Sequence, residues 1–322
     1  METIEKPYVI GLDLGGTNSV FGIVDARGEI KATTAIKTKG YSDPKDYVTA
    51  SVAALEPIID SVGGIEMIKG MGIGAPNGNY YTGQVEEAPN LDWKGSVPLA
   101  KLFEEQLGIP VALTNDANAA AMGEMTYGVA RGMKNFIMIT LGTGVGSGIV
   151  VNGQVVYGSD GFAGELGHAI IDRTPEARQC GCGRKGCLEA YCSATGIVRT
   201  AREMLIKDSR PSKLRSLNPD DITGLDVSVA AKEGDELAID ILRYTGRLLG
   251  KACANFALFC SPEAFIFFGG PTKSGEMLMK HVREAYDEDI LYVYKGKAKI
   301  LLSGLNGSDA AVLGASALGW EL

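Results

Sequence analysis

The chain has 322 residues, which is long for one hydrophobic core and suits two domains. The net charge of −8 argues against nucleic acid or an anionic membrane surface as a partner, and no run of about 18 apolar residues could span a bilayer. The 43 glycines indicate many tight turns, and the amino terminus lacks the pattern of a signal peptide, so we expect a cytoplasmic protein with reduced cysteines.

The first segment predicts a glycine-rich β-hairpin. A strand over residues 8–12 leads into Asp13-Leu-Gly-Gly-Thr-Asn18, and strands up to Val24 and over residues 30–36 follow. A P-loop or a dinucleotide-binding motif requires a helix after its glycines, whereas a strand follows here. The amide groups of such a turn still suit phosphate oxygens, and a carboxylate at its start could reach hydrated Mg²⁺. A plain hairpin turn is the competing interpretation.

A second segment repeats this plan. A strand over residues 136–140, a glycine-rich turn over residues 141–147 and a strand over residues 148–151 precede a type I′ turn at Asn152-Gly153 and a strand over residues 154–157. Repetition at about one domain length predicts two related domains. If each offers a glycine hairpin to a shared cleft, the two hairpins could hold a polyphosphate from both sides.

The segment between the hairpins predicts an α/β domain. Helices are expected over residues 44–59 and 98–107, and strands over residues 69–75 and 111–115. The second strand ends at Asn115-Asp116, and an alanine-rich helix follows to residue 127. Polar groups at strand ends are where ligands bind in open α/β sheets. Asp116 could equally cap the helix.

A cysteine-rich loop predicts a metal site. Glu165-Leu-Gly-His168 precedes Cys180-Gly-Cys-Gly-Arg-Lys-Gly-Cys-Leu-Glu189. The histidine and three cysteines, His168, Cys180, Cys182 and Cys187, form the Cys₃His set of a structural zinc site. We expect the glycines at 181, 183 and 186 to use left-handed backbone angles. Buried thiols or a disulfide are the alternatives, and Glu165 with Glu189 would suit the hydroxyl groups of a sugar.

The carboxyl-terminal part continues the α/β pattern. Helices are expected over residues 193–207, 236–259, 275–286 and 309–318, and strands over residues 264–268 and 299–302. Gly246 and Gly250 would let another helix approach the long second helix, and the last helix would return to the first domain. Residues 210–221 suggest a polar surface segment. Gly269-Gly270 lies between a strand and a helix, which suits an adenosine or its α-phosphate.

Five motifs stand in one order: Leu12-Asp-Leu-Gly-Gly-Thr-Asn, Asn115-Asp-Ala-Asn-Ala, Leu141-Gly-Thr-Gly-Val-Gly-Ser-Gly, Glu165-Leu-Gly-His and Cys180-Gly-Cys-Gly-Arg-Lys-Gly-Cys-Leu-Glu. From about Tyr8 to the carboxyl terminus the chain resembles the ROK family of sugar kinases and repressors. This family lies within the sugar kinase, heat-shock protein 70 and actin superfamily. The resemblance implies an α/β, two-lobed, actin-like (ribonuclease H-like) ATPase fold with duplicated β-hairpin phosphate motifs and a cleft between lobes. Residues 1–116 with 308–322 would form the smaller lobe, and residues 117–307 the larger one.

The resemblance also implies ATP with Mg²⁺, a structural Zn²⁺, a hexose acceptor and a homodimer or homotetramer. Asp116 would be the catalytic base. Sugar contacts would come from Asn90, Asn115, Asp116, Glu165, His168 and Glu189. Nucleotide contacts would come from Asp13, Gly15, Gly16, Thr17, Asn18, Gly142, Thr143, Gly144, Gly269 and Gly270. Pro271 stands where the family more often has glycine, and Asn77-Gly78 replaces a commoner Gly-Pro.

We therefore expect an ATP-dependent hexokinase that converts glucose to glucose 6-phosphate. Fructose, mannose, N-acetylglucosamine and N-acetylmannosamine are alternative acceptors. A sugar-sensing repressor is a second hypothesis, although seven residues precede the first strand here, and the family's repressors carry a winged-helix domain in that place. A sugar-binding protein without activity is the third, and the presence of Asp116 with both hairpins argues against it.

Overall fold

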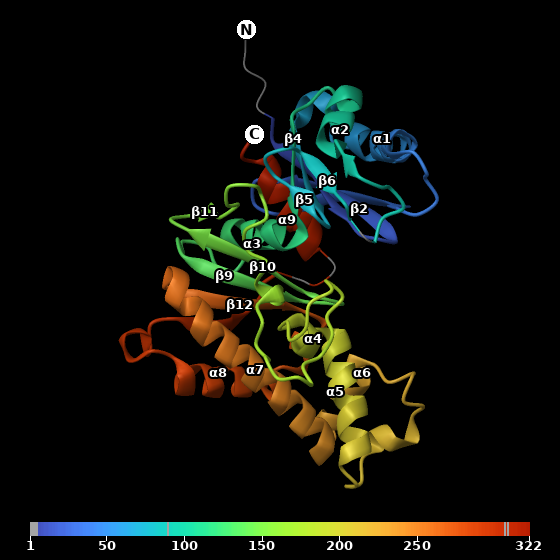
Figure 1. The fold of residues 1–322 in the computed structure, drawn as a ribbon. Coiled ribbons are helices and arrows are strands. Elements are labelled where there is room, and N and C mark those ends of the chain that lie inside the picture. Colours follow the sequence, from blue (N-terminus) through green and yellow to red (C-terminus); the bar gives the residue numbers. More distant parts are fainter. Residues whose placement is uncertain (1–5, 89, 306, 308) are drawn as a thin grey trace. The chain divides into compact units, whose positions relative to one another are not determined.

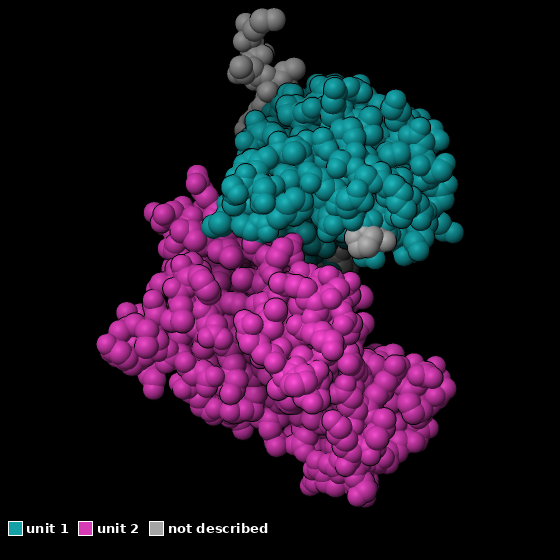
Figure 2. All heavy atoms as spheres, viewed as in Figure 1, with its two compact units in different colours: residues 1–133, 155–163, 303–322 teal, residues 134–154, 164–302 magenta. Residues whose placement is uncertain are grey.

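The computed structural model describes residues 6–88, 90–305, 307 and 309–322, and Figure 1 shows the order of its helices and strands. The chain forms two compact units, which Figure 2 colours separately. Unit 1 contains residues 1–133, 155–163 and 303–322, and unit 2 contains residues 134–154 and 164–302. Each unit has its own β-sheet and its own hydrophobic core.

A five-stranded sheet with the order β3-β2-β1-β4-β8 forms the centre of unit 1. Its strands are β1 (Tyr8–Leu14), β2 (Asn18–Asp25), β3 (Ile30–Lys37), β4 (Ile68–Ala75) and β8 (Val111–Asn115). β1, β2 and β3 pair antiparallel, whereas β1, β4 and β8 pair in parallel. All five strands lie where the sequence predicts them, because their apolar and β-branched residues suit a buried pleated surface.

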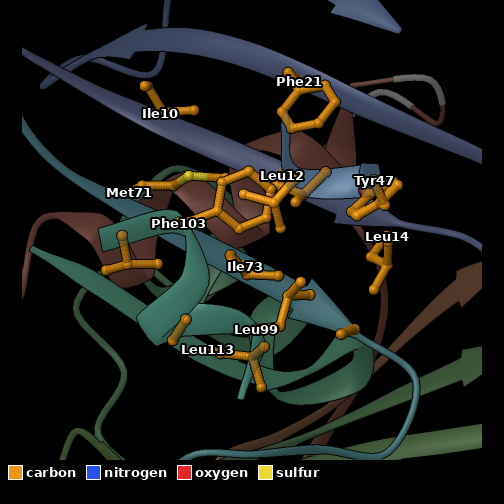
Figure 3. Packing of buried hydrophobic residues seen from close by; sticks show 14 of the residues in the cluster. Ile10, Leu12, Leu14, Phe21, Tyr47, Met71, Ile73, Leu99, Phe103 and Leu113 are labelled. Atoms are coloured by element: carbon orange, nitrogen blue, oxygen red, sulfur yellow. The ribbon is translucent and has the colours of Figure 1, made fainter. Parts of the chain in front are cut away.

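Four helices cover the two faces of this sheet. α1 (Pro44–Asp60) and α2 (Leu99–Leu107) pack on one face, where the core includes Leu12, Tyr47 and Phe103 (Figure 3). α3 (Asp116–Thr126) and α9 (Ala310–Gly319) pack on the opposite face and against each other. The predicted return of the last helix to the first domain is therefore confirmed, since α9 contacts β1 and β4.

Two glycines explain how closely α9 lies on the sheet. A Cβ atom on Gly11 of β1 would overlap the backbone carbonyl of Val312, and one on Gly72 of β4 would overlap that of Ala315. Side chains at these positions would push the helix away from the strands. The glycines of these strands therefore serve packing.

A small three-stranded sheet follows β4. It consists of β5 (Gly78–Asn79), β6 (Gln84–Glu86) and β7 (Ser96–Val97). Asn77 enters it with φ 51°, and its side-chain amide donates to the Glu86 carbonyl at 3.0 Å. Asparagine tolerates left-handed backbone better than most residues, which explains how Asn77-Gly78 fits this turn.

The sheet of unit 2 has the order β11-β10-β9-β12-β13. Each of its strands has a counterpart at the same place in the sheet of unit 1, β3-β2-β1-β4-β8. Its strands are β9 (Phe136–Leu141), β10 (Val145–Val151), β11 (Gln154–Val155), β12 (Ala264–Gly269) and β13 (Lys299–Leu302). β9 and β10 pair antiparallel, and β9, β12 and β13 pair in parallel. The predicted internal repeat is therefore confirmed.

Unit 2 contains α4 (Glu189–Cys192), α5 (Ala194–Lys207), α6 (Gly224–Lys232), α7 (Glu236–Cys260) and α8 (Glu276–Asp289). Gly246 and Gly250 lie against α8, as predicted: a Cβ atom on Gly250 would overlap the carbonyl of Val282. His281 of α8 keeps only 15% of its side chain exposed, because it lies beside Gly246.

Helix α6 is absent from the sequence prediction. It follows the polar segment at residues 210–221 and begins with a capping box formed by Thr223 and Asp226. With α5 and α7 it encloses a separate apolar cluster that includes Val227 and Ile241. Within the residues that the structure describes, the short 3₁₀-helices are Ile65–Met67, Leu166–His168, Lys213–Ser216, Gly270–Ser274 and Tyr292–Tyr294.

The boundary between the units differs from the predicted lobe boundary after residue 116. α3 and residues 155–163 belong to unit 1. The physical reason is that α3 packs closely against α9, where a Cβ atom on Gly123 would lie 2.8 Å from the Cα atom of Gly314. None of the helices in the described part of the chain is long and apolar enough to cross a membrane.

Candidate active site

The first glycine hairpin joins β1 to β2 in unit 1. The amide of Gly15 donates to the carbonyl of Asn18 at 3.1 Å, and Thr17 and Asn18 are exposed. Asn90 lies beside this turn: a Cβ atom on Gly16 would be 3.1 Å from the Asn90 Cβ atom. The structure thus brings Asn90, a predicted sugar contact, next to a predicted phosphate-binding turn.

Two carboxylates lie close to this hairpin. Asp13 stands near the end of β1, paired in register with Gly74 of β4, and Asp116 is the exposed first residue of α3. Burial raises the pKa of Asp13 to about 6, and the negative charge of Asp116 adds to this rise. Mg²⁺ prefers carboxylate ligands, and a divalent cation would lower that pKa again. The donor set at Asp13 therefore fits the predicted magnesium site.

Asn115, and not Asp116, is the N-cap of α3. Its side-chain oxygen accepts a hydrogen bond from the Ala117 amide at 2.8 Å. The Asp116 Oδ1 atom accepts from the same amide at 2.7 Å. The N-cap position that the sequence allowed for Asp116 is therefore occupied by Asn115. The Asp116 carboxylate lies at the positive end of the helix dipole.

The second glycine hairpin joins β9 to β10 in unit 2. The Gly142 amide donates to the Gly144 carbonyl at 2.9 Å, and Gly142 and Thr143 are exposed. The Glu189 Oε2 atom accepts from the Val145 amide at 3.0 Å, and a Cβ atom on Gly144 would overlap this oxygen. Glu189, predicted as a sugar contact, therefore also holds the base of the predicted nucleotide hairpin.

The segment that carries Glu165 and His168 packs on β10. Gly164 has φ 97°, and its carbonyl accepts from the Ser147 hydroxyl, whose oxygen in turn accepts from the Leu166 amide at 3.1 Å. A Cβ atom on Gly167 would overlap the Val145 carbonyl. These contacts fix the backbone that presents the Glu165 and His168 side chains. Glu165 is exposed, and His168 is partly buried.

The predicted metal ligands come together. The ligand atoms of His168, Cys180, Cys182 and Cys187 all lie within 4.8 Å of one another. Cys182 Sγ lies 3.7 Å from Cys187 Sγ, and Cys180 Sγ lies 3.8 Å from His168 Nδ1. A tetrahedral zinc ion with bonds of about 2.3 Å to sulfur requires ligand separations of about 3.8 Å. Both the donor set and the spacing fit a structural zinc ion.

The glycines of this loop have different tasks. Gly183 and Gly186 use positive φ values of 87° and 80°, as predicted, and a Cβ atom on Gly186 would overlap the Asp172 carbonyl. Gly181 is not among the residues with positive φ, and a Cβ atom there would meet nothing within 4 Å. The prediction of a left-handed Gly181 was wrong, because the turns of the loop fall at the other two glycines.

The third glycine turn ends β12. Gly269 has φ 111°, and a Cβ atom there would overlap the Leu141 carbonyl, so no other residue fits. A Cβ atom on Gly270 would meet nothing within 4 Å, and Pro271 is buried in the first turn of the following 3₁₀-helix. Proline suits this position because its fixed φ matches a helix start. Pro271 therefore does not distort the turn.

The sequence does not predict two residues that support the site. Ser147 connects β10 to Gly164 and Leu166, and the Thr195 hydroxyl donates to the Thr143 carbonyl at 3.0 Å. Both lie in segments that the sequence singled out. Their partners are backbone groups remote in sequence, which no spacing pattern reveals.

The comparisons with known proteins agree with this arrangement. The ROK family model matches residues 9–321. Glucokinase from Streptomyces coelicolor is 35% identical over 319 residues, which cover 97% of each chain. A xylose repressor from Caldicellulosiruptor bescii is 31% identical over 252 residues, or 78% of this chain and 62% of the repressor.

A crystal structure of a ROK family glucokinase from Streptomyces griseus, in complex with glucose and AMPPNP, is 33% identical. It aligns with a TM-score of 0.79 over 98% of this chain and 100% of the other. The predicted actin-like α/β fold with duplicated hairpins is confirmed by this likeness and by the repeated sheets. The chain therefore belongs to the ROK family.

Proposed function

We propose that this ATP-dependent sugar kinase phosphorylates glucose and forms glucose 6-phosphate. Support comes from the glucokinase of S. coelicolor, similar over 97% of each chain, and from the S. griseus enzyme that binds glucose and AMPPNP. The observation that carries the proposal is the oriented, exposed carboxylate of Asp116, which lies close enough to Asp13 for its charge to raise the pKa of that residue.

Asp116 is the proposed general base. Its carboxylate would accept the proton of the sugar hydroxyl, O6 in glucose, as that oxygen attacks the γ-phosphoryl group in line. The Ala117 amide donates to Oδ1 and orients the carboxylate at the start of α3. Phosphoryl transfer needs positioning and charge stabilisation more than covalent help. The proton therefore leaves the acceptor while the chain holds the reacting groups in place.

The two glycine hairpins are the proposed phosphate-binding elements. The backbone amides of these turns would donate to phosphate oxygens, apart from those of Gly15 and Gly142, which are bonded within their own turns. Gly269 and Gly270 would accommodate the nucleoside part. Mg²⁺, bound near Asp13, would offset charge on the transferred group.

The proposed sugar contacts come from both units, with Asn90, Asn115 and Asp116 from unit 1 and Glu165, His168 and Glu189 from unit 2. His168 would bind zinc through Nδ1, the ring nitrogen that faces Cys180, which leaves Nε2 for a sugar hydroxyl. Zinc would act as a structural clamp here. Glu189 can serve the sugar only through the carboxylate lone pairs that the Val145 amide does not occupy.

The test is sugar-dependent ADP release with ATP and Mg²⁺ over glucose, mannose, fructose, N-acetylglucosamine and N-acetylmannosamine. We expect the highest kcat/KM for glucose. Asp116→Asn should lower kcat by about two to four orders of magnitude, the usual contribution of a general base. Asp60→Asn, which removes an exposed carboxylate at the end of α1, is the matched control and should keep full activity. Near-normal turnover of Asp116→Asn would refute the assigned base.

The other sugars remain alternative acceptors. If the enzyme preferred one of them, only the assignment of glucose would be wrong, and the assignment as a sugar kinase would stand. The family also contains repressors, such as the xylose repressor of C. bescii. A non-catalytic regulator would show no ADP release with any sugar of the panel, and binding to operator DNA in a gel shift would support it. Sedimentation analysis tests the proposed homodimer or homotetramer.

A further inference from the structure

The start of α5 is bound to the second glycine hairpin. The Ala194 amide donates to the Gly142 carbonyl at 2.8 Å, and the Thr195 hydroxyl donates to the Thr143 carbonyl at 3.0 Å. Glu189, a few residues earlier, accepts from the Val145 amide at 3.0 Å. Consecutive residues of the turn are thus held by one short segment, residues 189–195, which follows the cysteine loop directly in the chain.

Peptide planarity gives these bonds a directional effect. In a trans peptide the carbonyl of one residue and the amide of the next point in opposite directions. The bond to the Gly142 carbonyl therefore sets the direction of the Thr143 N–H, and the bond to the Thr143 carbonyl sets that of the Gly144 N–H. Both N–H groups point away from residues 193–195. The Gly142 and Thr143 carbonyls thus face residues 193–195, and the Thr143 and Gly144 amides point the opposite way.

Thr195 itself is held for this task. Its Oγ1 atom lies 2.9 Å from the Ser193 Oγ atom, and the Ser193 oxygen accepts from the Gly196 amide at 3.0 Å as the N-cap of α5. The hydroxyl thus projects from the capped first turn of a fourteen-residue helix, and not from a free loop. A rigid donor keeps the peptide plane in one orientation.

We propose that Thr195 is a positioning residue for phosphoryl transfer, which aims the Gly144 amide at a phosphate group of the nucleotide. The proposal rests on the proposed function, since it takes the second hairpin as the phosphate-binding element. Thr195 does not touch the nucleotide. It acts through the Thr143–Gly144 peptide, and its loss should weaken binding of the phosphates while binding of the nucleoside is kept.

The experiment compares wild type, Thr195→Val and Thr195→Ser by isothermal titration with AMPPNP, ADP, AMP and adenosine. Valine keeps the shape but lacks the donor, and serine restores it. The loss of one neutral hydrogen bond predicts a roughly 3- to 10-fold weaker affinity of Thr195→Val for the nucleotide whose phosphate meets Gly144. Adenosine should bind equally well, and Thr195→Ser should bind within about twofold of wild type.

Thr49→Val is the matched control, because the Thr49 hydroxyl also donates to a backbone carbonyl, that of Lys45 at 2.9 Å, on an exposed part of α1. It should leave all four affinities unchanged. Equal weakening of phosphorylated and unphosphorylated ligands in Thr195→Val would show a general disturbance and overturn the proposal. An unchanged AMPPNP affinity would overturn it as well.

The titration separates this proposal from the choice of sugar. If wild type binds AMPPNP and does not phosphorylate glucose, only the glucose assignment fails. The comparison of the Thr195 variants then still tests the role of Thr195 in phosphate binding. In active protein we expect a higher KM for ATP and an unchanged KM for the sugar. An effect on the sugar KM alone would contradict a role at the hairpin.

Discussion

Asp13→Asn should stabilise the protein and weaken its activity at the same time. Burial and the charge of Asp116 raise the pKa of Asp13 from an ordinary 3.8 to about 6. Such a rise corresponds to about 3 kcal/mol against the ionised carboxylate, and the partial exposure of the side chain reduces this to roughly 1–2 kcal/mol. A carboxylate that is costly to ionise in the folded protein indicates a group kept for a cation.

The sign of the pH dependence follows from the raised pKa. Below pH 3.8 Asp13 is protonated in both folded and unfolded chains and costs nothing. Between that pH and about 6 the unfolded chain ionises first, so the folded state loses stability, and above pH 6 the full cost remains. Asp13→Asn lacks this cost. Its advantage over wild type should therefore appear only as the pH rises above about 4.

Thermal unfolding without metal or nucleotide at pH 4 and pH 8 measures this difference. We expect Asp13→Asn to gain a few degrees in Tm at pH 8 relative to wild type and almost nothing at pH 4. Added Mg²⁺ and AMPPNP should stabilise wild type and not the variant, and kcat/KM for ATP should fall. The same difference in Tm at both pH values would refute the ionisation argument.

Two further predictions concern the metal loop and the contact of α9 with the sheet. Removal of bound metal by a chelator, or the substitution Cys182→Ser, should release about one zinc per chain and raise the KM for the sugar, because His168 loses its fixed orientation. Cys260→Ser, outside the loop, is the control. Full retention of zinc by Cys182→Ser would contradict the ligand set. Gly72→Ala should destabilise the protein by roughly 2–4 kcal/mol in urea unfolding, since its Cβ atom would overlap the Ala315 carbonyl. The control Gly224→Ala, where a Cβ atom would meet only the Ala194 carbonyl at 3.9 Å, should be neutral or slightly stabilising. Equal effects of the two substitutions would speak against the close contact between α9 and the sheet.

The sequence predicts the long elements and the local motifs of this protein well. Strands such as β1 and the Cys₃His loop are encoded in contiguous residues, so periodicity and ligand spacing reveal them. The small sheet of β5, β6 and β7 has strands of two or three residues, too short for any periodic pattern. α6 has a capping box, yet its neighbourhood of charged and polar residues resembles a loop.

The tertiary contacts within the site are not predictable from spacing. The bond between Glu189 and the Val145 amide joins residues 44 positions apart, and the Thr195 bond to Thr143 joins residues 52 apart. The raised pKa of Asp13 depends on burial and on Asp116, which belongs to another strand–helix junction. Such properties arise only when the sheet brings its strand ends together.

The repeat itself explains why the acidic chemistry belongs to one unit. Asp13 in β1 pairs with β2 and β4, and Thr140 in β9 pairs with β10 and β12 in the same way, so a neutral residue stands where the first copy has a carboxylate. Asp116 follows β8, whereas Ser303 follows the equivalent strand β13 and donates to the buried Glu124 of α3.

Both copies keep the glycine hairpin, which fits the proposed phosphate binding, since that binding needs only backbone amides. The two carboxylates proposed as cation ligand and general base, Asp13 and Asp116, both belong to unit 1. The second copy carries instead the cysteine loop and the segment of residues 189–195 that holds its hairpin. From this division we expect Asp116→Asn to act mainly on kcat, and substitutions around the second hairpin to act mainly on the binding of ATP.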